Sequence, residues 1–362
     1  MLVTDQATLT RYRAENRNWQ GIPSIEVTAN GRLFAAFYSG GVTEQKGNYV
    51  VLLESRDDGR TWSEPIAAVD VGPDARAYDQ CLWIDPLGRL WLFWAVQPDA
   101  CIQYAICDDP DEETLRFSDI RTLDAMVMLN KPIVTRDGAW LFPCAIWAER
   151  VAVDGMRAKP GSEPGAYVFA SFDHGKTFSR LGSVQAKSRV FDEHMLLETP
   201  DGIDMFIRTR YGIAKSHSSD GGCHFSPETD SRFGGPGSRF FIGRLSSGRV
   251  LLVNHYMFAG RNNLTAILLG NDGLSYEGML LLDERADVSY PDAKEHNGFL
   301  YIVYDRERGA RYDPKADYTH SAREILMAKI TEEDILAGHP INPDSRLMQI
   351  VSSLGERGQN DD

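Results

Sequence analysis

Residues 193–208 read Glu-His-Met-Leu-Leu-Glu-Thr-Pro-Asp-Gly-Ile-Asp-Met-Phe-Ile-Arg, and this stretch predicts a strand, a tight turn and a second strand. Apolar runs on both sides flank Pro200-Asp201-Gly202, whose residue types are typical of hairpin turns. Because the turn reverses the chain, Glu193 and Arg208 should return to the same end of the hairpin. We therefore expect an acid and a guanidinium to lie together on one rim of a sheet.

The same plan recurs along the chain, with a turn glycine followed each time by an apolar strand. The six glycines are Gly31, Gly88, Gly138, Gly202, Gly248 and Gly298. Their spacing of about 46 to 64 residues is typical of propeller blades, each a four-stranded sheet with its loops. The sequence thus predicts an all-β fold, a six-bladed β-propeller, with the six glycines in equivalent turns.

One domain is expected over residues 1–362, because the repeat runs through most of the chain. Residues 1–19 should lead into the first blade or pack across it, and the polar tail 355–362 should be frayed. Residues 149–166 are expected to form an irregular insertion. A short helix is expected over 331–336, with Thr331 as its N-cap.

A second repeat of the form S-x-D-x-G-x-T-W is interleaved with the first. Copies begin at Ser55, Ser171 and Ser218, and a worn copy spans Asn271–Tyr276. Asp and Gly suit a tight turn, and the aromatic residue suits the core of a blade. A structural role is therefore favoured over a catalytic one, on the face opposite Glu193.

Composition excludes several classes of protein. The net charge of -14 and the pI near 5.1 argue against a nucleic-acid partner and indicate a soluble surface. No apolar run approaches the roughly 18 residues of a membrane-spanning helix, and no signal peptide is visible, so we expect no membrane partner and a cytoplasmic location. The odd number of cysteines and their spacing favour reduced, mostly buried thiols: Cys81, Cys101, Cys107, Cys144 and Cys223.

Charged and aromatic residues recur where the first strand of a predicted blade begins and the second ends. These positions should surround one funnel, with Glu44 on a loop above it; they are Arg76, Asp79, Lys131, Glu193, Arg208, Arg239, His255, Arg261, Tyr290, Asp292, Asp305 and Arg306. Clustered charges cost desolvation, which favours a binding role over a stabilising one. Plain ion pairs, such as Asp305 with Arg306, and a solvated propeller top are the structural alternatives.

On these residues the chain resembles the sialidase family of Asp-box propellers over nearly its full length. In that family a Glu precedes an Arg by a hairpin of this length, as Glu193 precedes Arg208. A second Arg precedes the nucleophilic Tyr by about one blade, as Arg261 precedes Tyr290, and Ser-Tyr-Pro-Asp is similar to the Tyr-Ser-Asp context of the family.

The resemblance implies a site in which Tyr290 is the nucleophile, Glu193 its base and Glu44 the acid/base. A phenol with an ordinary pKa near 10 needs such a base at neutral pH, and tyrosine nucleophiles are known in sialidases. Arg208 and Arg261 would hold a sugar carboxylate or hydroxyls. The remaining candidates for binding substrate are Arg76, Asp79, Lys131, Arg239, His255 and Asp292.

Two departures from the family stand out. Gly21 occupies the position of the first of three carboxylate-binding arginines, so Arg76 or Arg239 would have to replace it, and weak activity on common sialosides is expected. The loop before the first box offers Glu44 where sialidases have an Asp.

These observations favour an exo-acting, retaining glycosidase that removes a terminal and possibly acidic sugar. The alternatives are a uronate-processing polysaccharide lyase, with Tyr290, His194 or His255 as base, and a carbohydrate-binding propeller without catalysis. A carbohydrate partner is expected in each case. No cofactor is expected, and no spacing of His, Asp or Glu predicts a metal site.

Overall fold

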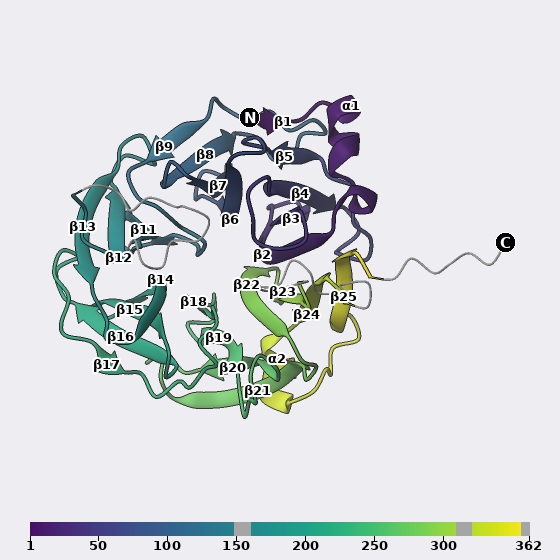
Figure 1. Ribbon diagram of the computed structural model, residues 1–362. Coiled ribbons are helices and arrows are strands. Elements are labelled where there is room, and N and C mark those ends of the chain that lie inside the picture. The colour runs from purple at the N-terminus through teal and green to yellow at the C-terminus, as the bar shows by residue number, and fades with distance from the viewer. Residues whose placement is uncertain (148–160, 309–320, 356–362) are drawn as a thin grey trace.

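The computed structural model describes residues 1–147, 161–308 and 321–355 of the chain. Six antiparallel sheets follow one another around a central axis, which confirms the predicted six-bladed propeller (Figure 1). Each blade packs between two neighbours, so its central strands are buried on both faces while its outermost strand is more exposed. Strand β7 (Leu90–Gln97), for example, is buried along its whole length.

The blades are built from consecutive strands, running outward from the axis. Blade 1 contains β2 (Trp19–Val27), β3 (Leu33–Gly40), β4 (Tyr49–Ser55), β5 (Ala67–Val69) and, outermost, β1 (Leu2–Val3). Blade 2 contains β6 (Arg76–Ile84), β7, β8 (Cys101–Cys107) and β9 (Arg121–Leu123). Blade 3 contains β10 (Ile133–Val134), β11 (Trp140–Ile146), β12 (Gly165–Ser171) and β13 (Ser179–Val184).

The second half of the ring follows the same order. Blade 4 contains β14 (Arg189–Thr199), β15 (Gly202–Thr209), β16 (Ile213–Ser218) and β17 (Thr229–Asp230). Blade 5 contains β18 (Phe241–Arg244), β19 (Val250–His255), β20 (Leu264–Leu269) and β21 (Tyr276–Asp283). Blade 6 contains β22 (Val288–His296), β23 (Phe299–Arg306), β24 (Glu324–Ile330) and β25 (Arg346–Ser353).

Helical structure is confined to short segments. Residues that precede β2 form α1 (Gln6–Leu9) and two 3-10 turns, η1 (Thr10–Tyr12) and η2 (Ala14–Asn16). The expected helix near residue 331 is α2 (Glu332–Ala337), and a capping box between Thr331 and Asp334 begins it. No described helix is long and apolar enough to span a membrane.

The turn glycines are equivalent in four of the six blades, where Gly31, Gly88, Gly138 and Gly248 each donate their backbone N–H to the carbonyl three residues earlier. Their φ angles lie between 82° and 89°, a left-handed conformation that glycine adopts without steric cost. Gly202 differs, with φ 149°, because Thr199 pairs directly with Gly202 and leaves only Pro200 and Asp201 in the turn. The prediction of six equivalent turns is therefore wrong at Gly202, although the β14–β15 hairpin itself is confirmed. It is also wrong at Gly298, because His296 pairs directly with Phe299 and leaves only Asn297 and Gly298 in the turn.

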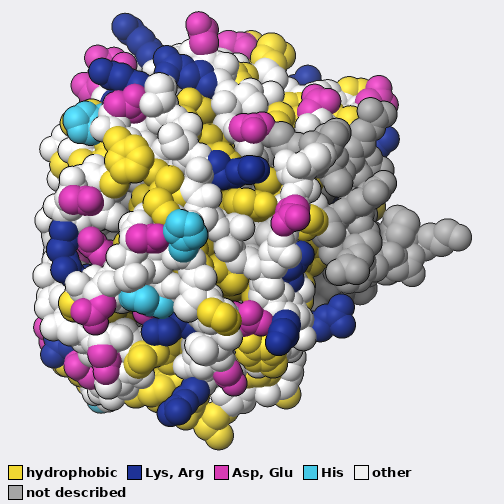
Figure 2. Space-filling model, turned by 90° about the vertical axis from the view of Figure 1, so that its left-hand side faces the viewer, with side chains coloured by type: hydrophobic (Ala, Val, Ile, Leu, Met, Phe, Trp, Pro, Cys, Tyr) yellow, Lys and Arg dark blue, Asp and Glu magenta, His cyan; other side chains and the backbone are white. Residues whose placement is uncertain are grey.

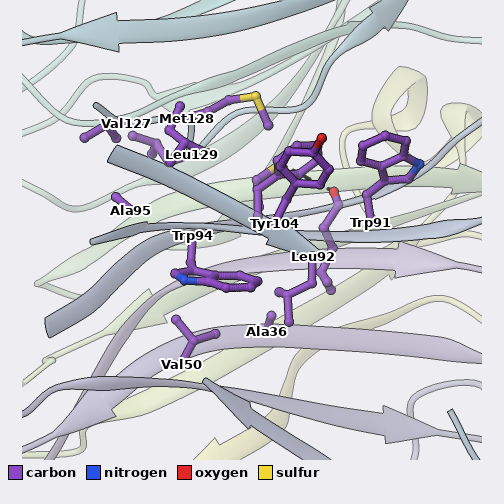
Figure 3. Packing of buried hydrophobic residues seen from close by; sticks show 14 of the residues in the cluster. Ala36, Val50, Trp91, Leu92, Trp94, Ala95, Tyr104, Val127, Met128 and Leu129 are labelled. Atoms are coloured by element: carbon purple, nitrogen blue, oxygen red, sulfur yellow. Dashed lines mark hydrogen bonds between the residues drawn. The ribbon is translucent and has the colours of Figure 1, made fainter. Parts of the chain in front are cut away.

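Aromatic side chains fill the core between the first three blades (Figure 3). The rings of Trp91 and Phe93 stack at 5.5 Å, and Trp83 meets Trp140 edge-on at 4.9 Å. Such pairs add about 0.5 to 1.5 kcal/mol each beyond the area that they bury. This packing holds blades 1, 2 and 3 together.

The S-x-D-x-G repeats are turns held by their own side chains. In the first copy, Asp57 accepts hydrogen bonds from Ser55 Oγ at 2.8 Å and from the Thr61 backbone N–H at 2.9 Å. Asp173 and Asp220 make the corresponding bonds in blades 3 and 4. The structural interpretation of these repeats is confirmed.

Side chains close the ring between blades 1 and 6, because each sheet is formed by consecutive strands. Asp58 accepts hydrogen bonds from Tyr301 Oη at 2.7 Å and from Lys329 Nζ at 2.6 Å. Gln20 Nε2 donates to the backbone carbonyls of Arg323 and Ser352 at 2.6 and 3.1 Å. An apolar core shared by both blades lies beneath these contacts.

Three sequence predictions concern the remaining segments. Most of the insertion expected over 149–166 and of the tail expected over 355–362 lies outside the described residues, and residues from Gly165 onward form β12 rather than irregular chain.

Cys81, Cys107 and Cys144 are buried and Cys223 is exposed. Acidic and basic side chains are interspersed on the face that Figure 2 shows.

Candidate active site

The inner strands carry a bulge at a similar level in four of the six blades. The pairing register of inner and second strand shifts between Gly21 and Ser24, between Tyr78 and Cys81, between Arg189 and His194, and between Ser289 and Asp292. A bulge re-aims a side chain and often lies next to an active site.

Left-handed residues sit in these bulges, among them Asp79 with φ 44° and Tyr290 with φ 55°. A residue other than glycine held in this region costs about 1 to 3 kcal/mol, which the surrounding structure must offset. Both side chains are almost completely buried. The bulges therefore hold an acid and a phenol, both almost buried, on the inner strands of blades 2 and 6.

Tyr290, Glu193 and Arg208 form a closed triangle of hydrogen bonds. Tyr290 Oη donates to Glu193 Oε1 at 3.1 Å, while Arg208 Nη1 donates to Glu193 Oε2 at 2.7 Å and to Tyr290 Oη at 3.0 Å. Each of the three residues is at most 6% exposed. The predicted meeting of Glu193 and Arg208 is confirmed, and Tyr290 joins them from two blades away.

The charges around Tyr290 act on its phenol in opposite directions. Burial raises its pKa and Glu193 raises it further, whereas Arg208 and the other guanidinium groups lower it; the balance is a raised pKa. Burial lowers the pKa of Arg208, but Glu193 and Tyr290 outweigh burial and raise it. The phenol thus keeps its proton at neutral pH and donates a hydrogen bond to Glu193.

Three guanidinium groups surround the Tyr290 ring. The Cζ atoms of Arg208, Arg261 and Arg308 lie 6.0, 5.3 and 4.6 Å from the ring centroid. Arg261 Nη1 also donates to Ser289 Oγ at 3.4 Å. Guanidinium groups bind carboxylates in bidentate geometry, so this arrangement is suited to an anionic ligand above the phenol.

Arg308 was not among the residues that the sequence singled out. It follows β23, and its Nη1 donates to Glu44 Oε1 at 3.1 Å while its Nε lies 3.5 Å from Asp305 Oδ2. A Cβ on Gly21 would lie 2.2 Å from Arg308 Cδ, so Arg308 fills the space that a side chain at position 21 would need. The one signal in the sequence was the glycine itself, which marks the space but not the residue that fills it.

Neither arginine proposed to replace the missing one lies at that position. Arg76 Nε donates to Gln97 Oε1 at 2.8 Å, and its guanidinium stacks on Tyr78 at 4.2 Å. Arg239 is fully buried and donates to Asn130 Oδ1 at 2.7 Å. The expectation that Arg76 or Arg239 substitutes is corrected by the position of Arg308.

Three of the predicted rim residues are buried among the inner strands: Lys131, Arg239 and Asp292. Lys131 Nζ lies 3.1 Å from Asp292 Oδ2 and 3.0 Å from Glu26 Oε1, and it also donates to two backbone carbonyls. Arg239 Nη2 lies 3.6 Å from Asp292 Oδ1. These charges tie the inner strands together, so their predicted exposure in the funnel is wrong.

Asp79 lies among several charges. Burial raises its pKa to about 8, the carboxylates of Glu44 and Glu193 raise it as well, and Arg76 and Arg239 oppose the shift. A carboxyl in this state carries its proton at neutral pH, unlike an ordinary aspartate.

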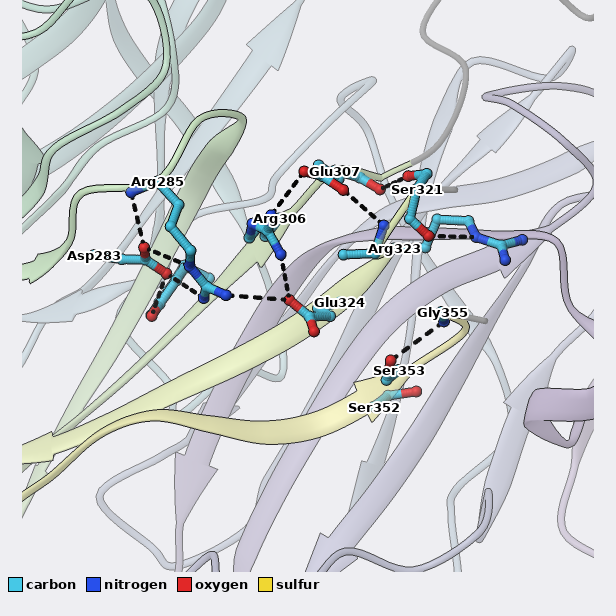
Figure 4. A network of polar contacts seen from close by, with 12 residues as sticks. Asp283, Arg285, Arg306, Glu307, Ser321, Arg323, Glu324, Ser352, Ser353 and Gly355 are labelled. Atoms are coloured by element: carbon cyan, nitrogen blue, oxygen red, sulfur yellow. Dashed lines mark hydrogen bonds and ion pairs between the residues drawn. The ribbon is translucent and has the colours of Figure 1, made fainter. Parts of the chain in front are cut away.

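His255, Asp305 and Arg306 make contacts typical of residues that stabilise a fold. His255 is buried, its Nδ1 faces the Asn262 carbonyl oxygen at 2.7 Å, and burial lowers its pKa to about 4. Arg306 pairs with Glu324 and Glu307 in the network of Figure 4 and not with Asp305. Asp305 is fully buried and accepts a hydrogen bond from the Ile22 N–H at 2.7 Å.

Among the described residues, no group of three or more His, Cys, Asp or Glu side chains is arranged to hold a metal ion.

A six-bladed propeller with a buried tyrosine–glutamate pair beneath three arginines defines a sialidase-like propeller of the BNR type. Residues 31–302 match the family described as BNR repeat-like domain, and the chain belongs to this family. No curated protein matches the sequence.

Solved structures with a similar fold include several sialidases. The intramolecular trans-sialidase from Ruminococcus gnavus is 14% identical with a TM-score of 0.68, and the match covers 92% of this chain and 98% of that one. Hadza microbial sialidase Hz136 is 18% identical with a TM-score of 0.64 over 79% of this chain, which spans 63% of the length of that protein. A Dyadobacter fermentans protein of unknown function is 19% identical with a TM-score of 0.61, covering 81% and 92%. At these identities the likeness shows the fold.

Proposed function

We propose that this protein is an exo-acting, retaining glycoside hydrolase that removes a terminal acidic sugar. The observation that carries the proposal is the hydrogen bond of 3.1 Å from Tyr290 Oη to Glu193, beneath three guanidinium groups. A nucleophile and its base within hydrogen-bond reach, with the base fixed by a third group, are the signature of covalent catalysis.

The chemistry follows from these contacts. Tyr290 Oη attacks the anomeric carbon and gives its proton to Glu193, while the bond to the leaving oxygen breaks and that oxygen takes a proton from a neighbouring acid. Water then attacks the glycosyl–tyrosine, its proton returns to the acid, and the phenolate recovers its proton from Glu193. The acid is one of the carboxyls beside the pair, Glu44 or Asp79.

The substrate class is inferred from charge. Arg208, Arg261 and Arg308 converge on one ring, and a phenol, unlike a carboxylate nucleophile, adds no negative charge before it reacts. A sugar carboxylate suits this site. Because Arg308 supplies a third guanidinium, the reason for expecting weak activity on sialosides is removed, and sialosides become the first substrates to test.

The experiment is a screen of 4-nitrophenyl glycosides of N-acetylneuraminic, glucuronic and galacturonic acids, followed by kinetics of variants. Tyr290→Phe keeps the ring but removes the nucleophilic oxygen, so turnover should fall by roughly 10³-fold or more. Glu193→Gln should impair the same step, and the double variant should be scarcely worse than the single ones because the two residues act as a unit.

A matched control is Tyr304→Phe, which removes another buried phenol oxygen from blade 6, one bonded to Asp283 at 3.1 Å. This variant should keep its activity. Tyr290→Phe activity close to that of the wild type would contradict the mechanism. Products absorbing as unsaturated uronides would indicate a lyase instead.

A further inference from the structure

A cavity of about 380 Å³ lies on the propeller axis, and the inner strands of all six blades contribute residues to its lining. In blade 6 these residues are Ala293, Lys294 and Glu295, near the end of β22, whereas Tyr290 lies near its start. At about 3.3 Å per residue, Lys294 is up to about 13 Å further along the strand than Tyr290. The cavity therefore occupies the end of the axis opposite the candidate active site, and its volume is within the range of small-molecule sites.

Five charged side chains form a row of ion pairs at the inner end of this cavity. The two oxygens of the fully buried Glu26 lie 3.0 Å from Lys131 Nζ and from Lys294 Nζ. Lys131 Nζ is 3.1 Å from Asp292 Oδ2, and Asp292 Oδ1 is 3.6 Å from Arg239 Nη2. We call this row the axial ion chain. It alternates in sign with a cation at each end, so it carries one positive charge in excess.

Lys294 is the end of the axial ion chain that reaches the open part of the cavity. Its side chain is 29% exposed, compared with 10% for Lys131. Glu26 is the one ion-pair partner of Lys294 in the described part of the chain, and Lys131 shares that partner. A cation that is partly withdrawn from water and only partly neutralised attracts an anion. The excess charge of the row is thus accessible from the cavity at Lys294.

The other charged residues of the lining balance one another. Glu198 accepts a hydrogen bond from the Arg136 backbone N–H at 3.0 Å and lies 3.7 Å from Arg136 Nε. Glu295 accepts from the Ser246 backbone N–H at 2.7 Å, and Arg244 donates to the Glu198 carbonyl oxygen at 2.9 Å. Two acids and two arginines meet at this mouth, so the excess positive charge of the axial ion chain is not cancelled there.

Most of the remaining lining is apolar. Val134 is 40% exposed, and the other apolar lining residues include Trp83, Ile133, Met195, Leu197, Ile242 and Leu245. An ion without an apolar part would leave these walls in contact with water. A ligand that suits the whole cavity therefore combines one negative charge with an apolar chain.

We propose that this cavity binds an aliphatic monocarboxylate of medium chain length. The carboxylate lies beside Lys294 and supplies the single negative charge that the axial ion chain lacks, whereas a phosphate monoester would bring nearly two. The alkyl chain extends along the apolar walls toward Val134 and removes them from water. The site is separate from the candidate active site, so this inference does not depend on the proposed glycosidase function.

Calorimetric titration of the full-length protein with sodium octanoate at pH 7 tests the proposal. Acetate lacks the chain, octan-1-ol lacks the charge, and octylamine reverses it. Octanoate should bind at one site per chain and at least about tenfold more tightly than each of these three compounds. Octanol or octylamine binding as tightly as octanoate would overturn the proposal, as would the absence of octanoate binding.

Lys294→Met removes the charge and keeps an unbranched side chain. Octanoate binding should weaken about tenfold or more, while the affinity for octanol should stay the same. The matched control is Lys176→Met, in the exposed turn between β12 and β13, which should bind octanoate as the wild type does. A Lys294→Met protein with wild-type affinity for octanoate would contradict the role of the axial ion chain.

Val134→Trp tests the apolar walls without changing a charge. Because Val134 is partly exposed, the fold should accommodate the larger ring, and thermal unfolding of the variant checks this. The indole should fill the mouth of the cavity and weaken octanoate binding about tenfold or more. A folded Val134→Trp protein that binds octanoate normally would show that the ligand lies elsewhere.

The three guanidinium groups around Tyr290 are the other place where a carboxylate could bind. Arg261→Ala separates the two sites, since this variant should bind octanoate as tightly as the wild type. Loss of binding in Arg261→Ala together with normal binding in Lys294→Met would place octanoate at the candidate active site and overturn the proposal. Lack of activity on every glycoside would leave the octanoate titrations unchanged, and it would count against the proposed function alone.

Discussion

Gly21 and Arg308 share one volume beside Tyr290. Gly21 leaves space in β2, and the methylenes of Arg308 fill it, so that its guanidinium reaches the Tyr290 ring at 4.6 Å. The size of the residue at position 21 therefore controls where a charge in another blade can lie.

Gly21→Ala should lower kcat/KM about 10-fold or more, because one misplaced guanidinium forfeits roughly 1.5 to 3 kcal/mol of charged hydrogen bonding. The loss should be mainly in KM if Arg308 holds the ground-state substrate. Steady-state kinetics of the purified variant on the best glycoside of the screen measure it. In an Arg308→Ala background the same substitution should have no further effect, since the clash is gone. Additive losses would show that Gly21 acts on something other than Arg308.

The sequence was sufficient to predict which residues meet when a single hairpin brings them together. Glu193 and Arg208 flank one turn, so their meeting could be predicted from spacing. Arg308 could not, because it reaches the site from a loop of blade 6 and nothing local ties it to Gly21. Lys131 and Asp292 were misplaced because a strand position gives the face of a residue but not its depth along the axis.

At the scale of elements, the repeat identified the blades because turn glycines and apolar strands are local features. The bulges of the inner strands have no such signal. In the sequence, Asp79 and Tyr290 look like ordinary strand residues. Only the structure shows that each lies in a bulge and has a left-handed backbone. The elements were therefore predictable, but the directions of the side chains in these bulges were not.

Hydrogen bonds to Asp58 also join two elements, blade 1 and blade 6. Burial opposes ionisation of Asp58, yet hydrogen bonds from Lys329, Tyr301 and Arg346 outweigh it, and the pKa of Asp58 is lowered. Asp58→Asn should destabilise the protein by about 1 to 2 kcal/mol, because Lys329 loses its charged partner. Denaturant unfolding at pH 7 measures this, and in a Lys329→Met background the loss should be smaller.

This difference should depend on pH. Because the pKa of Asp58 is lower in the folded state, its contribution is complete above the unfolded value near 3.9 and is lost as the pH falls through the folded value. The stabilities of wild type and Asp58→Asn should thus begin to approach each other below the unfolded value of about 3.9, and they should converge only below the lower folded-state pKa. A constant gap down to pH 2 would mean that the charge of Asp58 is not what stabilises the junction.

At the scale of the whole molecule, the apolar face of blade 1 depends on blade 6. Ile25 and Phe37 share one core with Tyr301 and Met327. A chain that ends at residue 286, before β22, should expose this face, bind a hydrophobic dye and elute as aggregates in size-exclusion chromatography. A chain that ends at residue 355 is the matched control and should elute as the full-length protein does. A monodisperse 1–286 fragment would show that blade 1 can cover its face without blade 6.

In the described part of the chain, side-chain contacts join blades 1 and 6, so the ring can close only after blade 6 has been synthesised. Blade 1 is translated first, but its partner strands end only at Ser353, roughly 280 residues after β5. At cellular elongation rates this delay lasts about 15 to 60 s, far longer than a hairpin needs to form. During that interval the apolar face of blade 1 that packs on blade 6 stays uncovered. Slower elongation should therefore increase the need for chaperones that bind this face, and faster elongation should reduce it.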